Sequence, residues 1–210
     1  NQASYMYATG WQQLTWQKDL RFDTPPADWG YDDAVMCDWF ADRVIALSGK
    51  GEPFLAGMLT LSSHRPFDVP FSKFVDKELN AFAFSDECVG RMVDKLKASP
   101  AWDNLLLVLV ADHGYPWPRS LSYNEPLRHR IPMIWLGGAV AAPRVVDTYA
   151  SQIDICATIL GQLGIDHSDF DYSKDIFAPT PPRKFAYYTF NDGFGVVDAS
   201  GEAVWDATSG

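Results

Sequence analysis

The chain has little positive charge, no long apolar run and no paired cysteines, and each absence excludes a class of protein. Its 17 lysines and arginines are outnumbered by 27 aspartates and glutamates, which gives a net charge of −10. Nucleic-acid binding needs a basic surface to neutralise phosphates, so we expect no nucleic-acid partner. The longest apolar run, Leu105 to Ala111, is far shorter than the roughly 18 residues of a membrane span. The sequence therefore predicts no membrane helix within this chain.

Common frameworks and motifs are also missing. The three cysteines, Cys37, Cys88 and Cys156, are far apart and none belongs to a C-x-x-C pair, so we expect buried thiols rather than disulfides. There is no Gly-rich phosphate loop and no G-x-S-x-G elbow. An acidic chain without such a loop needs a local device, such as a metal ion, to hold an anionic substrate. The chain starts at Asn1 without a signal peptide, and we interpret it as a piece of a longer protein.

The apolar pattern that is present alternates between the periods of helices and strands. It predicts an α/β domain with a mostly parallel sheet and helices on both faces, followed by a small antiparallel β-meander. We expect a main body over residues 1–178 and the meander over residues 179–210. The helices are predicted at 31–47, 73–98 and 151–163, the last with Ser151 as its N-cap, and the strands of the main body at 53–61, 105–111 and 131–136.

Polar side chains follow two of the predicted strands. Asp112 and His113 come directly after the 105–111 strand, and His64 follows the 53–61 strand. Ligands of open α/β sheets bind outside the carboxyl ends of the strands. A carboxylate beside an imidazole suits Mg²⁺, Mn²⁺ or Zn²⁺, so Asp112 and His113 are candidate metal ligands. The alternative is that Asp112 caps a turn and His113 is an ordinary hydrogen-bonded loop residue.

Two further histidines have weaker patterns. His64 would donate a hydrogen bond to an anionic oxygen or act as a general acid, or it is simply part of a turn. His129, between Arg128 and Arg130, would reach the same sheet edge and contact substrate, or it is a structural residue of a basic loop.

Four segments together resemble one family, the sulfatase-type branch of the alkaline phosphatase superfamily. Within it, the closest pattern is that of phosphoglycerol transferases similar to lipoteichoic acid synthase. The core of the resemblance is V-x-x-A-D-H-G at 108–114, and the segments occur in the family's order. The segments are Phe54–Pro70, Trp102–Gly114, His129–Gly138 and Ser151–Gly164. The resemblance implies part of an alkaline phosphatase/sulfatase-like sandwich, with this chain as the C-terminal part of the catalytic domain.

The resemblance also implies roles. Asp112 and His113 would bind a divalent cation, Mn²⁺ or Mg²⁺ first and Zn²⁺ as a further candidate. His64 would contact the phosphate of the substrate. A threonine would attack a phosphodiester and form a covalent intermediate, with the metal lowering its pKa and offsetting charge. That threonine lies upstream of the position matching Asn1 in the family, so this chain holds no nucleophile and we expect it to be inactive alone.

The implied partners are a phospholipid head group, or another phosphodiester or sulfate ester. The implied location is the extracytoplasmic face of the bacterial cell membrane, through an upstream anchor. Two alternatives stay open. One is sulfate-ester hydrolysis, although no cysteine here begins the C/S-x-P-x-R motif of sulfatases. The other is a non-catalytic relic of the fold that binds a glycan or a partner, for which the eight tryptophans and nine tyrosines provide stacking surfaces.

Overall fold

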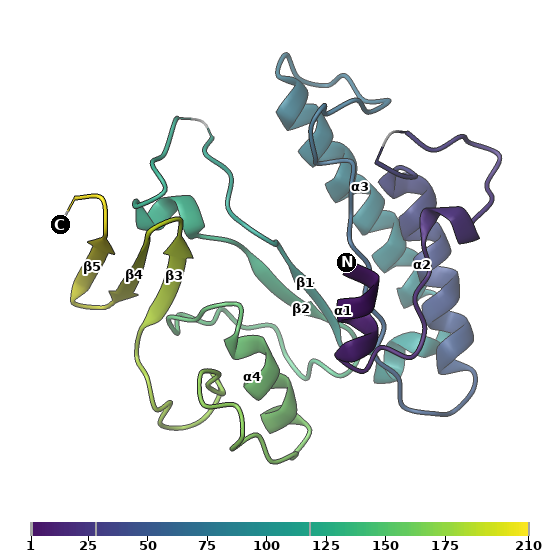
Figure 1. Ribbon diagram of the computed structural model, residues 1–210. Coiled ribbons are helices and arrows are strands. Elements are labelled where there is room, and N and C mark those ends of the chain that lie inside the picture. The colour runs from purple at the N-terminus through teal and green to yellow at the C-terminus, as the bar shows by residue number, and fades with distance from the viewer. Residues whose placement is uncertain (1, 28, 118, 210) are drawn as a thin grey trace. The chain divides into compact units, whose positions relative to one another are not determined.

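The chain folds into two compact units, which the computed structural model describes over residues 2–27, 29–117 and 119–209. The first unit comprises residues up to Leu106 together with Gly137–Ala139. The second comprises Leu107–Leu136 and the residues from Val140 onward. Figure 1 traces the chain through both, and each is described by itself below.

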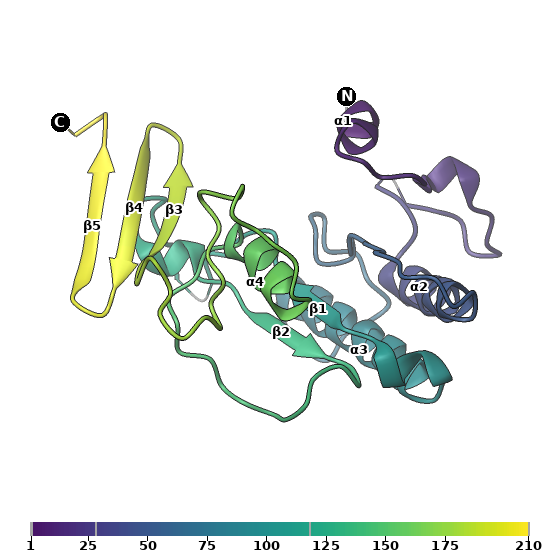
Figure 2. The same ribbon diagram turned by 90° about the horizontal axis from the view of Figure 1, so that it is seen from below.

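The first unit is built on two helices that pack side by side, α2 (Asp33–Ser48) and α3 (Lys77–Lys97) (Figures 1 and 2). Shorter elements accompany them: α1 (Gln2–Ala8) and the 3-10 helices η1 (Gln17–Asp19) and η2 (Pro100–Asn104). The two helices were predicted from their apolar spacing, with ends that differ by a few residues. Their buried stripes provide the core, from Cys37, Phe40, Ala41 and Val44 on α2 and from Phe84, Cys88, Met92 and Leu96 on α3.

A buried carboxylate joins these helices to the loop that carries His64. Asp33, in the first turn of α2, is 1% exposed. Its Oδ1 accepts hydrogen bonds from the backbone N–H groups of Leu61 and Ser62, at 2.7 and 3.2 Å, and its Oδ2 accepts one from the Ser85 hydroxyl of α3, at 2.6 Å. Every acceptor oxygen of this carboxylate thus has a donor, as a buried charge requires.

The segment Pro53–Leu61 is not the buried strand that its apolar run predicts. It belongs to no sheet, and Leu55 and Leu59 are 80% and 75% exposed. A strand is stabilised by backbone hydrogen bonds to a neighbour, and the described residues supply no such neighbour here. The segment is anchored instead by the hydrogen bond from the Leu61 N–H to Asp33 and by Gly57, which lies against the Trp11 ring.

The second unit contains two small antiparallel sheets and one helix. Strands β1 (Leu107–Val110) and β2 (Met133–Leu136) pair with each other, and η3 (Pro126–His129) lies between them in sequence. Helix α4 (Asp154–Gln162) follows. The last sheet has the strand order β3 (Ala186–Phe190), β4 (Gly193–Asp198) and β5 (Gly201–Asp206), which Figure 2 shows side by side.

These sheets confirm the predicted meander but not the predicted parallel sheet. All strand pairs in the described residues are antiparallel, including the β1–β2 pair that was expected in a parallel sheet. β1 is only partly buried, and Val110 at its end is 42% exposed, so the prediction that both faces are covered is wrong for this strand.

Helix α4 begins three residues later than predicted. Its N-cap is Ile153, not Ser151. Asp154 nevertheless reaches back as the pattern suggested, because its Oδ2 accepts a hydrogen bond from the Ser151 N–H at 2.8 Å.

The thiols of Cys37 and Cys88 are buried between α2 and α3, and Cys156 is half-buried; all three are free, as predicted. Burial raises the pKa of Cys37 to about 12, and the nearby Asp33 carboxylate adds to the shift. Burial likewise raises the pKa of Cys88 to about 11. No helix among the described residues has the length and apolar character needed to span a membrane.

Replacing Asp33 should destabilise the protein more than replacing its neighbour. Asp33→Ala leaves two backbone N–H groups and the Ser85 hydroxyl without their acceptor, so we expect the free energy of unfolding to fall by about 3 kcal/mol. The matched control is Asp32→Ala, which removes only the N-cap bond to Val35 and should cost about 1 kcal/mol. Urea unfolding followed by tryptophan fluorescence measures both; equal losses would contradict the role given to Asp33.

The two buried cysteines predict a loss of stability at alkaline pH. In the unfolded chain their thiols ionise near pH 8.5, whereas in the folded state their raised pKa keeps them protonated. The folded state then binds more protons, so the free energy of unfolding falls as pH rises from about 9 towards 11–12. Urea midpoints across this range should fall more steeply for the natural chain than for the Cys37→Ala/Cys88→Ala variant. Parallel curves would rule the prediction out.

Candidate functional site

The Asp112–His113 pair lies in a turn that follows β1. Asp112 Oδ1 accepts a hydrogen bond from the His113 N–H at 2.9 Å, which leaves Oδ2 facing the imidazole. The distance from Asp112 Oδ2 to His113 Nε2 is 3.6 Å. The structure therefore brings together the two side chains that the sequence singled out as metal ligands, and both are well exposed, at 81% and 70% of the side chain.

One hydrogen bond sets which imidazole nitrogen of His113 carries the proton. His113 Nδ1 lies 2.9 Å from the Gly114 carbonyl oxygen, which can only accept. Nδ1 is therefore the protonated nitrogen of the neutral ring, and Nε2 keeps its lone pair on the side of Asp112. A carbonyl bonded to the other ring nitrogen is the usual way in which a metal-binding histidine is oriented.

Gly114 closes the turn against the backbone of residues 128–130. A Cβ at Gly114 would lie 2.1 Å from the Arg128 carbonyl oxygen, so no other residue fits without moving the backbone. The Arg128 guanidinium in turn donates to the Gly114 carbonyl oxygen and lies over the Tyr123 ring. The carbonyl that orients His113 is thus also held by Arg128.

The donor atoms of this pair are compatible with one divalent cation. Two metal–ligand bonds of about 2.1 Å reach atoms separated by up to about 4.2 Å, so Asp112 Oδ2 and His113 Nε2 can share an ion. The set is incomplete, however: no group of three or more His, Cys, Asp or Glu residues suited to a metal lies within the described part of the chain. The pair supplies two ligands and leaves the remaining positions to other groups.

His129 belongs to the same unit and is held by the loop and the meander. Its Nε2 lies 2.6 Å from the Tyr123 carbonyl oxygen, so Nε2 carries the proton and Nδ1 keeps a lone pair. Its ring stacks on Tyr188 of β3, with centroids 4.3 Å apart. These contacts give His129 a structural role, and a contact with substrate remains a prediction.

His64 lies in the first unit, in the turn after the 53–61 segment. Its Nδ1 donates to the Arg65 carbonyl oxygen at 2.7 Å, and its exposed ring lies against Trp29 with centroids 4.5 Å apart. The ring is therefore oriented and has Nε2 available to a ligand. Because His64 and the Asp112–His113 pair belong to different units, their convergence on one site also remains a prediction.

Two polar residues beside the turn were not recognised as parts of a site from the sequence. In the sequence Arg128 is simply part of a basic loop, and Gln152 belongs to no motif. Gln152 donates from Nε2 to the carbonyl oxygens of Ala111 and Asp112, at 2.7 and 2.9 Å. Only the position of Gln152 just before a helix could have drawn attention to it, and that signal is common to many surface residues.

Comparison with known proteins matches the chain to one family model, described as Sulfatase, over residues 1–165. Phosphoglycerol transferase I of Xanthomonas axonopodis pv. citri (strain 306) is 27% identical over 168 residues, which covers 73% of this chain and 23% of that protein. The chain spans about a quarter of the length of such curated relatives.

Two solved structures share the fold over nearly the whole chain. One is a protein in the alkaline phosphatase superfamily from Vibrio parahaemolyticus, with a TM-score of 0.85 and 24% identity, covering 98% of this chain and 52% of that one. The other is the lipoteichoic acid synthase LtaP from Listeria monocytogenes, with a TM-score of 0.79 and 20% identity, covering 99% and 60%. These matches confirm the predicted α/β superfamily fold.

Substituting Gly114 should disturb the turn, because the added Cβ meets the backbone oxygen of Arg128. For Gly114→Ala we expect a fall of about 1–3 kcal/mol in the free energy of unfolding and a loss of the Nδ1–H signature of His113 in imidazole ¹⁵N NMR spectra. The control is Gly90→Ala on α3, where a Cβ meets nothing within 4 Å. That variant should gain about 0.5–1 kcal/mol. An unchanged His113 signal in Gly114→Ala would contradict the orientation described here.

Proposed function

Because the chain belongs to the sulfatase family, we propose that its protein is a metal-dependent enzyme acting on a phospholipid or another phosphodiester. The reaction is transfer, or hydrolysis, of a phosphoglycerol-type group, the activity named for its relative in Xanthomonas. The observation that carries the proposal is the Asp112–His113 pair, with two ligand atoms 3.6 Å apart and the imidazole lone pair turned towards the carboxylate.

In this proposal Asp112 Oδ2 and His113 Nε2 hold a divalent cation, with Mn²⁺ or Mg²⁺ preferred and Zn²⁺ as a further candidate. The ion would lower the pKa of the nucleophile and offset negative charge on the transferring group. Such an ion would also attract the anionic phosphodiester locally, although the net charge of −10 on the chain otherwise repels it.

His64 is proposed to bind a phosphate oxygen of the substrate. Its Nδ1 is already committed as a donor to the Arg65 carbonyl, so a second hydrogen bond from Nε2 needs the imidazolium form. An anionic phosphate beside the ring favours that form, and the Trp29 ring keeps the imidazole from turning away. His129 is proposed as a further substrate contact through Nδ1.

The nucleophile is proposed to be a threonine outside this chain. Its Oγ would form a bond to phosphorus, the bond from phosphorus to the lipid alcohol oxygen would break, and the proton of the threonine would end on that departing alcohol. An acceptor hydroxyl or water would then take the phosphoglycerol group from the threonine. We also propose that the enzyme lies at the extracytoplasmic face of the bacterial membrane, held by an anchor outside this chain, as the family resemblance implies.

The test uses the complete protein encoded by the gene, with phosphatidylglycerol vesicles and added Mn²⁺. We expect Mn²⁺-dependent formation of diacylglycerol, and near-complete loss of it in Asp112→Ala and in His113→Ala. The matched control is Asp86→Ala, which removes an exposed carboxylate from α3 and should leave the rate unchanged.

The same preparations are offered an aryl sulfate. Hydrolysis of the sulfate ester without turnover of the lipid would replace phosphoglycerol transfer by sulfatase activity. If the Asp112→Ala and His113→Ala variants both retain the function of the natural protein, the result would instead support a relic of the fold that binds a glycan or partner.

A further inference from the structure

A single side-chain amide clamps the backbone of the turn that carries Asp112 and His113. Gln152 Nε2 donates to the Ala111 carbonyl oxygen at 2.7 Å and to the Asp112 carbonyl oxygen at 2.9 Å. Both partners can only accept, so the NH₂ group of the amide must face them. These bonds cross about 40 residues of sequence and attach the segment before α4 to the end of β1.

The clamp fixes where the strand ends. In an extended strand, successive carbonyl groups point to opposite sides, so two of them cannot reach the same donor. Here both reach Gln152 Nε2, which requires the backbone to turn at Asp112. The direction in which Asp112 and His113 project is set by that turn, together with the bonds to Gly114 on its other side.

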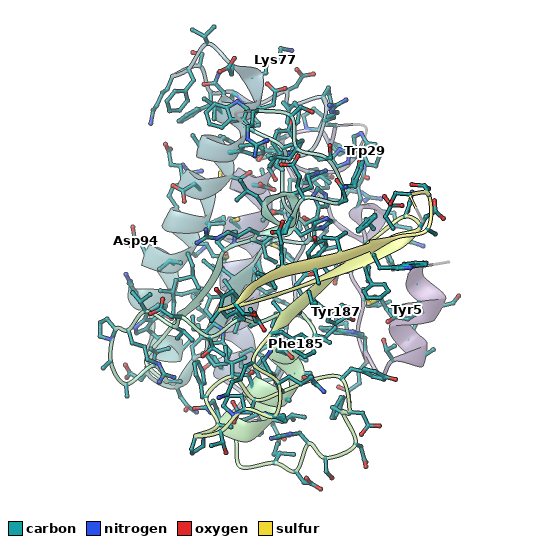
Figure 3. All side chains as sticks on the ribbon, turned by 90° about the vertical axis from the view of Figure 1, so that its left-hand side faces the viewer. Tyr5, Trp29, Lys77, Asp94, Phe185 and Tyr187 are labelled. Carbon is teal, nitrogen blue, oxygen red and sulfur yellow. The ribbon has the colours of Figure 1, made fainter. Side chains whose placement is uncertain are left out.

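The base of the clamp is rigid because Ser151 is held on two sides. The Ser151 hydroxyl donates to the Tyr187 carbonyl oxygen at 2.7 Å and accepts from the Tyr187 N–H at 2.8 Å. The Ser151 N–H donates to Asp154, whose carboxylate also faces Lys174 Nζ at 3.3 Å. Lys174 donates in turn to the Phe185 carbonyl oxygen at 2.6 Å; Phe185 and Tyr187 are labelled in Figure 3.

Gln152 itself contributes little to the folded state. Its side chain is exposed, unlike the buried Asp154 and Lys174 beneath it. Hydrogen bonds at such a position stabilise a protein only modestly, because water replaces them when they are lost. Both amide hydrogens of this exposed side chain nevertheless bind the backbone of the turn that carries Asp112 and His113. This arrangement indicates a role in orienting the two ligands rather than in stabilising the fold.

We infer that Gln152 is a positioning residue for the metal ligands Asp112 and His113, an inference that rests on the proposed function. It acts through the carbonyls of Ala111 and Asp112 and touches neither the metal ion nor the substrate. Hydrogen bonds of this kind behind metal ligands typically change metal affinity or activity by about 10–100-fold.

The experiment compares the complete protein with its Gln152→Ala and Gln152→Glu variants. Gln152→Glu keeps the size of the side chain but turns a carboxylate towards two carbonyl oxygens. The control is Gln162→Ala, an exposed glutamine at the C-terminal end of α4. Mn²⁺ binding is measured directly, by electron paramagnetic resonance of the free ion, and again as the Mn²⁺ concentration that gives half-maximal turnover of phosphatidylglycerol.

We expect the Mn²⁺ dissociation constant to rise by about 10-fold or more in Gln152→Ala, and further in Gln152→Glu, with thermal unfolding close to that of the unmodified protein. The lipid KM should change little, since Gln152 does not contact substrate. Gln162→Ala should match the unmodified protein in every measurement. Variants that only unfold earlier, with Mn²⁺ affinity unchanged, would show a purely structural role and overturn the inference.

The same measurements separate this inference from the proposed function. Mn²⁺ binding that weakens in the Gln152 variants, without any turnover of lipid in the unmodified protein, would support the positioning role and reject the phosphoglycerol reaction. Turnover that needs Asp112 and His113 but keeps its Mn²⁺ dependence in both Gln152 variants would reject only the positioning role. Absence of Mn²⁺ binding in the unmodified protein would reject both.

Discussion

The second unit depends on one buried ion pair, Lys174 with Asp154. The two side chains are 1% and 5% exposed, and their charged atoms lie 3.3 Å apart. Charges so far from water are tolerated only when each is paired and hydrogen-bonded. Asp154 meets this condition through the N–H groups of Ser151 and Lys174, and Lys174 through the Phe185 carbonyl. Loss of one partner would leave the other charged and alone in the interior.

The pair joins three pieces of chain that lie far apart in sequence: the start of α4, the segment around Lys174 and the approach to β3. The segment just before α4 brings Gln152 to the end of β1, and β3 brings Tyr188 to the ring of His129. The exposed candidate ligands of this unit are therefore held by segments that the buried Lys174–Asp154 pair connects. A site of this kind keeps its geometry although its own residues face water.

Local patterns in the sequence sufficed for the three longest helices of the described residues and for the meander. Apolar spacing located α2, α3 and α4, and Gly-containing turns located the last three strands. The sheet was not predictable in the same way, because an apolar run such as Pro53–Leu61 becomes a strand only where another backbone is available to pair with it. The start of α4 was displaced for a similar reason, since Ser151 bonds to Tyr187 instead of capping the helix.

The candidate site likewise combines features that local sequence predicts with features that depend on distant residues. Asp112 and His113 are neighbours in sequence, and their position after an apolar strand made them visible as a possible ligand pair. The orientation of the pair comes from Gln152, Arg128 and Gly114, two of which reach it across long stretches of chain. No spacing rule relates a glutamine before one helix to the carbonyls at the end of a strand 40 residues earlier.

The buried Asp33 has a consequence for the order in which the first unit is assembled. Its carboxylate needs donors from the loop that precedes His64, 28 residues after Asp33, and from Ser85, 52 residues after Asp33. During synthesis the loop therefore lacks its full anchor until α3 has emerged and docked on α2. Closing so long a loop costs conformational entropy before the contacts that offset this cost can form. The His64 turn therefore acquires its final shape late, when the two helices dock.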